Sequence, residues 1–247
     1  MKKALIVIPT YNEAQNISDL LEKIFKTVPD IHVLIIDDNS PDRTAFIVET
    51  YIEKNTFNGQ LHLMRRPGKL GLGTAYIQGF TWGLEKGYDV FISMDADFSH
   101  NPKYLPSMLQ EIKTHDLVIG SRYVKDGGVV NWGFGRRLLS RGGCLYAQIL
   151  LFTKVRDLTG GFNCYKRENL MRLKLDSIIS KGYCFQIEMK FRHILLGCKI
   201  KEKPIVFHDR VNGASKMNQN IFKEAILNTL KLSFNRFKLI KLMKKDV

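Results

Sequence analysis

The sequence lacks three features that would each point to a different class of protein. No stretch comes near the roughly 20 apolar residues that a membrane-spanning helix requires, so we expect that the chain does not cross a membrane by itself. The apolar run that follows Lys2 and Lys3 stops at Pro9, which is too short for the core of a signal peptide. The four cysteines form no CxxC pair, which argues against a zinc site or a disulfide frame and favours reduced thiols in a cytosolic protein.

Acidic residues are scarce relative to basic ones. The chain has 24 Asp and Glu against 38 Lys and Arg, which gives a net charge of +14. Such an excess favours polyanionic partners, namely nucleic acid, phosphorylated small molecules or an anionic membrane. No nucleic-acid-binding motif is present, and the basic residues are densest in the tail and beside acidic strand ends. We therefore expect no nucleic-acid partner.

Apolar runs of strand length alternate with helical stripes through the first half of the chain. Buried strands are predicted near residues 4–8, 33–36, 61–64, 90–94 and 117–120. Helices fall between these runs, which predicts an α/β fold with a mostly parallel, Rossmann-like sheet and helices on both faces. Gly71-Leu72-Gly73 precedes one helix, but it follows the third strand and lacks the third glycine, so it does not indicate a dinucleotide cofactor.

Polar residues cluster at the ends of four predicted strands. These clusters are Pro9-Tyr11-Glu13, Asp37-Asp38, Asp95-Asp97 and Ser121-Arg122. Ligands of parallel sheets bind outside the carboxyl ends of the strands, so the four clusters predict one shared site.

Asp95 and Asp97 are the most informative pair in the chain. In extended backbone, residues i and i+2 point the same way, so both carboxylates can face one spot beyond the strand end. Two hard oxygen ligands suit a divalent cation that keeps its waters and binds a substrate diphosphate. The alternative interpretation is an ordinary polar turn. His100 follows closely, and we interpret it as a structural loop residue rather than a general base.

The regular alternation ends after Arg122. Residues 125–135 are rich in glycine and predict a mobile loop, and a helix should run from Arg136 to about Phe152. Arg136 and Ser140 are one turn apart and share a helix face, which suits a phosphate ligand but also fits a solvated basic helix start. A short strand after residues 157–162, a helix over 186–195 and a strand over 199–206 should follow. The basic segment 208–216 could fold over an anionic ligand.

The tail divides the chain into a domain of residues 1–217 and a terminal segment of residues 218–247, which we predict to be one long helix. Lysines cluster opposite one broad apolar face of this helix or at its border. Six residues form that face: Phe222, Ile226, Leu230, Phe234, Phe237 and Ile240. A basic amphipathic helix either docks on a membrane surface or a membrane partner, or packs its apolar side on the domain.

A set of motifs in fixed order resembles one known family. They are Ile8-Pro9-Thr10-Tyr11-Asn12-Glu13, Asp37-Asp38-Asn39-Ser40-Pro41-Asp42, Met94-Asp95-Ala96-Asp97-Phe98-Ser99-His100, Gly120-Ser121-Arg122-Tyr123, Asp157-Leu158-Thr159-Gly160, Lys181-Gly182-Tyr183 and Gly213-Ala214-Ser215-Lys216. From about residue 4 to 217 the chain resembles the dolichyl-phosphate (polyprenyl-phosphate) mannose synthases, which are family 2 glycosyltransferases with the GT-A nucleotide-sugar fold.

The resemblance implies roles for individual residues. The guanosine would be held by Pro9, Tyr11, Glu13, Ile36 and Asp38, with Ala96 contributing its backbone. Mg²⁺ or Mn²⁺ would be held on the diphosphate by Asp95 and Asp97, with Ser99 as a weaker third ligand. Asp97 and Arg122 would be the catalytic residues. The phosphates of donor and acceptor would be bound by Arg122, Arg136, Ser140, Arg210 and Lys216, of which Lys216 serves the donor, Arg136 and Ser140 the acceptor, and Arg122 and Arg210 both.

The implied reaction is an inverting transfer of mannose from GDP-mannose to dolichyl or polyprenyl phosphate. The product would be a lipid-linked mannose donor for protein glycosylation or other glycan assembly. The acceptor phosphate is mostly ionised near neutral pH, since its second pKa is about 6, so it needs positioning more than a general base. The resemblance implies a peripheral enzyme on the cytoplasmic face of the plasma membrane or the endoplasmic reticulum, with possible small transmembrane partner subunits. A hexosyltransferase for another nucleotide sugar and an inactive binding homologue are the alternatives.

Overall fold

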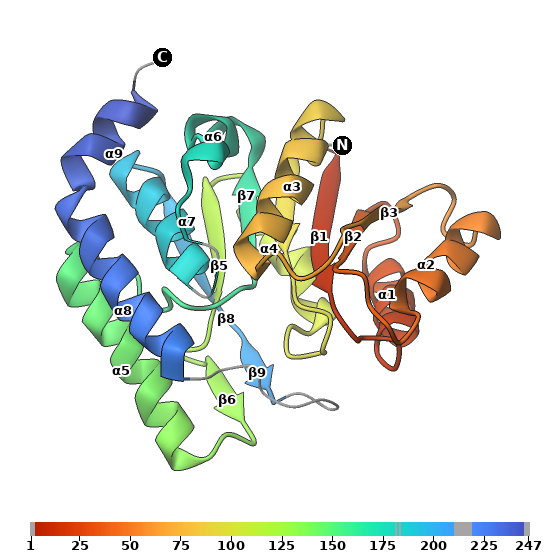
Figure 1. Ribbon diagram of the computed structural model, residues 1–247, viewed down its shortest axis with the longest axis horizontal. Coiled ribbons are helices and arrows are strands. Elements are labelled where there is room, and N and C mark those ends of the chain that lie inside the picture. Colours follow the sequence, from red (N-terminus) through yellow and green to blue (C-terminus); the bar gives the residue numbers. More distant parts are fainter. Residues whose placement is uncertain (1–2, 181, 183, 210–218, 245–247) are drawn as a thin grey trace.

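The computed structural model describes residues 3–180, 182, 184–209 and 219–244, except for the side chains of residues 219–224. Over these residues the chain forms a seven-stranded sheet, a small two-stranded sheet and flanking helices (Figure 1). No helix in the described part is both long and apolar enough to span a bilayer. The four cysteines are free thiols, as their spacing predicts.

The large sheet has the strand order β3-β2-β1-β4-β7-β5-β8. Its strands are β1 (Ala4–Thr10), β2 (His32–Asp37), β3 (Leu61–Arg65), β4 (Val90–Ser93), β5 (Leu117–Ser121), β7 (Asn163–Lys166) and β8 (Ile200–Pro204). Only β7 runs antiparallel, paired with β4 on one side and β5 on the other. The predicted, mostly parallel sheet is thereby confirmed, together with its first five strands.

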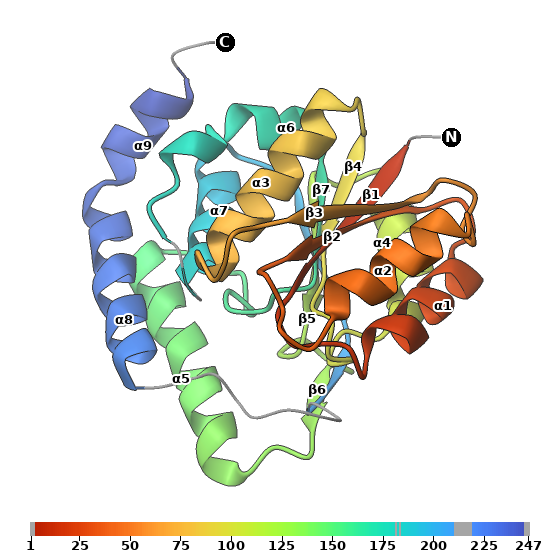
Figure 2. The same cartoon turned by 45° about the vertical axis from the view of Figure 1, so that its right-hand side comes forward.

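Helices cover both faces of this sheet, which turning the molecule by 45° makes clear (Figure 2). They are α1 (Ile17–Thr27), α2 (Thr44–Glu53), α3 (Leu72–Glu85), α4 (Leu105–Glu111), α5 (Phe134–Leu151), α6 (Arg167–Arg172), α7 (Cys184–Leu195), α8 (Gln219–Phe234) and α9 (Arg236–Met243). Short 3₁₀ turns lie at Pro102–Tyr104 and Leu175–Ser177. Alternate residues of β1 enter opposite cores: Leu5 and Val7 pack with α3 and α7, and Ile6 and Ile8 with α1 and α4.

Three details of the sequence prediction are wrong. The glycine-rich loop contains a strand, β6 (Gly128–Val130), and the strand predicted over 199–206 divides into β8 and β9 (Val206–His208). Ile205 is buried between β8 and β9, and β9 then pairs in parallel with β6. The tail is two helices, because Asn235 interrupts the helical dihedral angles and donates its side-chain amide to the carbonyl of Lys231.

The glycines of α3 permit close packing of this helix on the sheet. A Cβ at Gly79 would lie 2.5 Å from Val7 Cγ1 and 2.7 Å from Ile36 Cδ1. A Cβ at Gly73 would lie 2.7 Å from the carbonyl oxygen of Ser180 and 2.9 Å from the Phe185 ring. Gly73, the second glycine of the G-x-G pattern, therefore has a packing role at the start of α3.

Replacing Gly79 with alanine is expected to lower the free energy of unfolding by about 1–3 kcal/mol, since the added methyl group overpacks the core. Gly142→Ala on α5 is the matched control, because a Cβ there meets no atom within 4 Å. It should stabilise the protein by up to about 1 kcal/mol through helix propensity. Urea unfolding of both variants measures the difference, and equal stabilities would contradict the packing argument.

Helix α7 is unusual because its charged side chains lie in the interior. Glu188, Lys190, Arg192 and His193 are all 0% exposed. Arg192 pairs with Glu188 at 2.7 Å and donates to the carbonyl of Leu173, so the pair is compensated inside the protein. His193 Nδ1 lies 2.8 Å from the Met189 carbonyl, to which it donates as the neutral imidazole.

Acid is expected to destabilise the protein through His193. Burial lowers the pKa of His193 from 6.5 to about 4. Between these two pH values the unfolded chain binds a proton that the folded chain does not, so stability falls as the pH falls. At pH 5 this one residue should cost about 2 kcal/mol relative to pH 7. Urea unfolding should therefore show a smaller loss between pH 7 and 5 for His193→Asn, and an unchanged loss would exclude this residue as a cause.

Candidate active site

The carboxyl ends of the parallel strands form one edge where the chain reverses its direction of travel across the sheet. From β1 the chain moves outward to β2 and β3, then returns through α3 to β4 on the other side of β1. Such a switch point is where ligands of open α/β sheets bind. Pro9 and Asp38 flank it on one side, and Asp95 and Asp97 follow the end of β4 on the other.

Asp37 organises the backbone at the end of β2. It is 1% exposed and accepts hydrogen bonds from the hydroxyl of Thr10 (2.9 Å), the hydroxyl of Ser40 (2.6 Å) and the N–H of Ser40 (2.8 Å). These bonds join the ends of β1 and β2. Asp37 therefore fixes the backbone conformation at this edge. The next residue, Asp38, is one of those predicted to hold the nucleoside.

Two basic residues outside the predicted site lie near Asp38 and Tyr11. Arg66 is 4% exposed, with its Nε 3.2 Å from Asp38 Oδ1, and it donates to the hydroxyl of Thr74 at 2.9 Å. Lys69 Nζ lies 3.6 Å from the centroid of the Tyr11 ring. Both residues come from the β3–α3 connection, whose glycines are its most conspicuous sequence feature. The positive charge of Arg66 and Lys69 was the sequence signal that could have identified them as candidate site residues.

The remaining residues predicted to hold the nucleoside lie at the same edge. Glu13 accepts from the side chain of Asn16, and its own N–H donates to Thr44. Pro9 is half-buried at the end of β1, but the Ile36 side chain is 0% exposed and packs in the core. Ala96 is 4% exposed. Ile36 and Ala96 can therefore serve a ligand only through their backbone.

Asp95 and Asp97 differ in exposure and in their partners. The Asp95 side chain is 35% exposed, and its Oδ1 accepts from the Tyr76 hydroxyl at 3.2 Å. Burial and then Asp95 raise the pKa of Tyr76 well above 10, so the phenol stays a donor. Asp97 is 5% exposed, and its Oδ1 accepts from the hydroxyl of Ser99 at 2.6 Å. In the structure, Ser99 therefore orients Asp97, and its role as a metal ligand stays a prediction.

The two carboxylates fit a divalent cation shared with a substrate. No group of three or more His, Cys, Asp and Glu side chains among the described residues could hold a metal by protein ligands alone. Mg²⁺ commonly binds through one or two carboxylates together with substrate phosphates and water, which is the donor set that Asp95 and Asp97 offer.

His100 is buried and stabilises the backbone of the segment that carries Asp95 and Asp97. Its Nδ1 accepts the backbone N–H of Asp95 at 2.9 Å, and its ring stacks on Phe162. Burial lowers its pKa, against the opposite effect of Asp95 and Asp97, so the ring stays neutral at pH 7. Because Nδ1 is already an acceptor for the backbone, His100 has a structural role, as the sequence interpretation expected.

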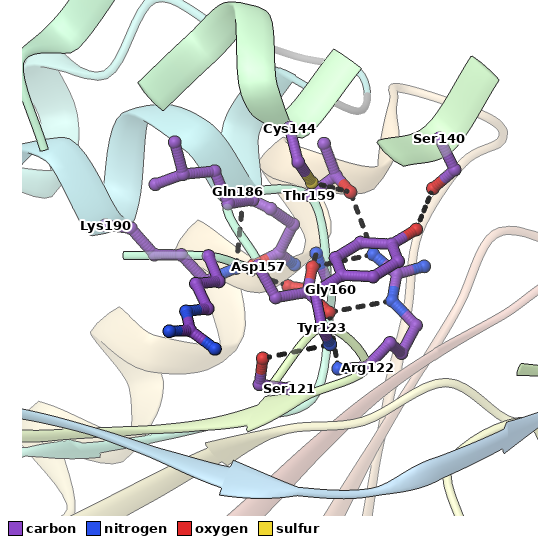
Figure 3. Close-up of polar contacts among 12 residues, drawn as sticks. Ser121, Arg122, Tyr123, Ser140, Cys144, Asp157, Thr159, Gly160, Gln186 and Lys190 are labelled. Carbon is purple, nitrogen blue, oxygen red and sulfur yellow. Dashed lines mark hydrogen bonds and ion pairs between the residues drawn. The ribbon is translucent and has the colours of Figure 1, made fainter. Parts of the chain in front are cut away.

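Arg122 is held by a buried partner that the sequence did not reveal. Its Nε donates to Asp157 Oδ2 at 2.8 Å, and its Nη2 donates to Asp157 Oδ1 at 2.7 Å and to Thr159 at 2.8 Å (Figure 3). Burial would raise the pKa of Asp157, but the guanidinium lowers it to about 2. Lys190 adds a second cation and donates to the carbonyl of Gly160 at 2.5 Å. Asp157 thus fixes the orientation of Arg122.

A row of aromatic rings joins the aspartate pair to Arg122 and α5. Phe207 packs edge-on against His100, and the guanidinium carbon of Arg122 lies 5.4 Å from the Phe207 centroid. Trp132 follows, with the guanidinium carbons of Arg122 and Arg136 at 5.7 and 4.2 Å from its ring. The strands β9 and β6 and the turn before α5 therefore bring the basic residues to the same side as the aspartates.

Two of the residues predicted to bind the acceptor phosphate, Arg136 and Ser140, lie at the start of α5. Ser140 accepts a hydrogen bond from the Tyr123 hydroxyl at 2.6 Å, and Tyr123 follows Arg122 directly (Figure 3). Arg136 pairs with both carboxylate oxygens of Asp209 at 2.8 Å. Arg122, Arg136 and Ser140 are thus brought together around Tyr123 and Trp132. Arg210 and Lys216 lie outside the described residues, and their roles stay predictions.

The fold and this edge of the sheet define a nucleotide-sugar glycosyltransferase with the GT-A architecture. Among solved structures, the chain is similar to glucosyl-3-phosphoglycerate synthase of Mycobacterium tuberculosis, with a TM-score of 0.66, 16% identity, and coverage of 94% of this chain and 80% of that one. It is also similar to the mannosyltransferase PcManGT of Pyrobaculum calidifontis in complex with GDP-Man and Mn²⁺, with a TM-score of 0.57, 15% identity, and coverage of 98% and 73%. At these identities the similarity shows the fold.

Sequence comparison gives the family. The pattern described as glycosyl transferase family 2 matches residues 5–174. The chain is 45% identical to the undecaprenyl-phosphate mannosyltransferase of Micrococcus luteus, over 92% of both chains. It is 40% identical to the polyprenol monophosphomannose synthase of Mycolicibacterium smegmatis, over 91% of this chain and 84% of the relative. The protein belongs to glycosyl transferase family 2, and within it to the polyprenyl-phosphate mannose synthases.

Proposed function

We propose that this protein transfers mannose from GDP-mannose to a polyprenyl phosphate, with inversion at the sugar, to give polyprenyl phosphate β-mannose and GDP. One observation carries the proposal: an aspartate pair suited to a diphosphate-bound cation lies on the same edge of the sheet as a buried, rigidly held arginine. The 45% identity to a mannosyltransferase for undecaprenyl phosphate supports the choice of donor sugar and lipid.

The residues divide into a donor side and an acceptor side. On the donor side, the nucleoside is held by Asp38, Tyr11 and the connection that carries Arg66, and Asp95 and Asp97 are the residues that would hold Mg²⁺ or Mn²⁺. The cation, when bound, stabilises the negative charge that develops on the leaving GDP. The fixed guanidinium of Arg122 contributes to the same stabilisation, because its orientation is set before the substrate arrives.

The acceptor side needs cations and hydroxyls rather than a base. A phosphate monoester is mostly ionised near neutral pH, so its oxygen can attack the sugar carbon once it is positioned. Arg122, Arg136 and Ser140 supply positive charge and a hydroxyl at this end of the site. In agreement, His100 is engaged with the backbone of Asp95. The acceptor lipid resides in a membrane, so the enzyme acts as a peripheral protein at the cytoplasmic surface of that membrane.

The test is transfer of labelled sugar into lipid. The protein is incubated with radiolabelled GDP-mannose, a polyprenyl phosphate and Mg²⁺, and the mixture is extracted with organic solvent. Label is expected in the organic phase, and chelation of the metal with EDTA should abolish its appearance. A parallel incubation with UDP-glucose separates the mannosyl activity from that of another hexosyltransferase. Label that stays in the aqueous phase with GDP-mannose would refute the proposal.

A further inference from the structure

Gln186 carries a buried amide group whose hydrogen bonding is incomplete. The residue lies in the first turn of α7 and is 2% exposed. Its Oε1 accepts a hydrogen bond from Asn163 Nδ2 at 3.0 Å, and the same nitrogen donates to the carbonyl of Gly160 at 3.1 Å, so the orientation of both amides is fixed. Gln186 Nε2 is buried and has no hydrogen-bond partner among the residues that the structure describes. A buried donor without an acceptor is unfavourable, which indicates that its acceptor comes with a ligand.

The unpaired nitrogen faces the space beside Gly161, at the edge of the sheet that carries the aspartate pair. A Cβ on Gly161 would lie 3.6 Å from Gln186 Nε2, 3.6 Å from Asp95 Oδ1 and 3.3 Å from the ring of His100. The amide donor and the carboxylate therefore border one small space, which a side chain at position 161 would fill. Gly161 is partly exposed and the Asp95 side chain is 35% exposed, so this space opens toward the candidate active site.

The turn over which this space lies is held rigidly. The hydroxyl of Ser93 donates to the carbonyl of Gly161 at 2.6 Å. Lys190, one helical turn after Gln186, donates to the carbonyl of Gly160 at 2.5 Å, and both side chains come from α7 (Figure 3). The backbone of the turn is thus engaged by its own neighbours and offers no acceptor to Nε2. The donor is positioned in advance for a group from outside the chain.

A single donor next to a single carboxylate restricts the chemistry of that group. A hydroxyl can accept from Gln186 Nε2 and donate to Asp95 Oδ1 at the same time. Asp95 Oδ1 has a second lone pair besides the one that accepts from Tyr76, and Oδ2 is left for the predicted cation. An ionised phosphate oxygen can only accept, and the carboxylate would repel it. The geometry therefore favours a sugar hydroxyl over a phosphate.

We propose that Gln186, together with Asp95, binds one hydroxyl of the mannosyl group of the donor, and that Gly161 keeps the space for this hydroxyl open. The inference rests on the proposed function and adds a residue that selects the sugar. The sugar is attached to the diphosphate, which lies at the same aspartates, so its ring is within reach of this space. The last torsion of a glutamine side chain is soft, so Nε2 can turn to meet the hydroxyl. A donor completed only by a substrate hydroxyl discriminates against a sugar that lacks it.

The test compares the affinities for GDP-mannose and for GDP, measured by isothermal titration calorimetry with Mg²⁺ and without an acceptor. Gln186→Met should weaken the binding of GDP-mannose about fivefold to tenfold and leave that of GDP unchanged, because only the sugar loses a hydrogen bond. Gly161→Ala should have the same selective effect by filling the space, and its nearest neighbour at 3.3 Å allows the methyl group with a small adjustment. Gln110→Met, at an exposed position of α4, is the matched control and should keep both affinities.

Analogues of GDP-mannose that each lack one hydroxyl give a second measurement. One analogue should bind the wild type more weakly than GDP-mannose does, and Gln186→Met should not weaken its binding further. Equal weakening of GDP and GDP-mannose in Gln186→Met would assign a merely structural role and overturn the inference, as would unchanged binding of both. If Gln186→Met does not fold, Gly161→Ala decides by the same criteria. Wild-type binding of UDP-glucose in place of GDP-mannose would refute the proposed function, and UDP-glucose and UDP would then be the pair that tests Gln186.

Discussion

Asp97→Ala is expected to lower mannosyl transfer by at least about a thousandfold, because charge on the leaving diphosphate would lose its main stabilisation. Asp97 is nearly buried, and Ser99 already fixes its orientation through the hydrogen bond to Oδ1. Asp95 alone would leave the cation a single carboxylate, and one oxygen of Asp95 already accepts a hydrogen bond from Tyr76. Initial rates of lipid labelling measure the loss.

Asp89→Ala is the matched control for this experiment. Asp89 precedes β4, so it lies at the opposite end of the strand that Asp97 follows, where its carboxylate accepts the N–H of Lys3. We expect its transfer rate to stay within about twofold of the wild type, since it is remote from the developing charge. Titration with Mn²⁺ in the presence of GDP should show weaker metal binding for Asp97→Ala alone. An Asp97→Ala variant with the turnover of the wild type would remove the metal site from the mechanism.

Asp157→Ala is expected to have the largest combined effect on stability and activity. Removing this carboxylate leaves the guanidinium of Arg122, 7% exposed, without its buried partner. Breaking such a pair costs about 3–5 kcal/mol of unfolding free energy. Transfer should fall by about a hundredfold or more, because Arg122 is no longer oriented toward the developing charge.

A double substitution distinguishes loss of stability from loss of positioning. Arg122→Met with Asp157→Leu replaces the pair by apolar side chains, which should restore part of the stability but none of the activity. The restoration is partial because the N–H groups of Arg122 and Gly160 lose their acceptor. Asp116→Asn is the control. Asp116 directly precedes β5 and forms a partly exposed ion pair with Lys166, so its substitution should lower the free energy of unfolding by only about 1 kcal/mol. Urea unfolding and initial rates are measured on each variant. Full activity in the double variant would show that Arg122 has no part in transfer.

The strand-end clusters were predictable because the signals that place them are local. An apolar run such as residues 4–8 is typical of a doubly buried strand, and Asp95 and Asp97 directly follow the similar run that forms β4. The parallel sheet then brings separate strand ends to one edge without any knowledge of individual contacts. The motifs around Tyr11, Asp38 and Arg122 gave the family for the same reason.

The contacts that hold the site were not predictable, because they join residues that are distant in the sequence. The Arg122–Asp157 pair spans 35 positions, and the Arg136–Asp209 pair spans 73. Several carboxylates could serve either arginine, and only the packing of β5 beside β7, or of β6 beside β9, selects one. The exclusion of His100 from base chemistry likewise depends on its bond to the backbone of Asp95.

By itself the sequence determined the α/β class and the membership of a family, and it predicted the aspartate pair as a metal site, since each depends on spacing within a few residues. The tertiary structure alone decided which arginines form ion pairs with aspartates. It also decided that apolar side chains of α5 such as Phe134 and Ile149 stay outside the core. The physical reason is that helical periodicity reports an apolar face without saying what covers it. The packing of α8 on α5 covers one side of that helix and leaves the other exposed.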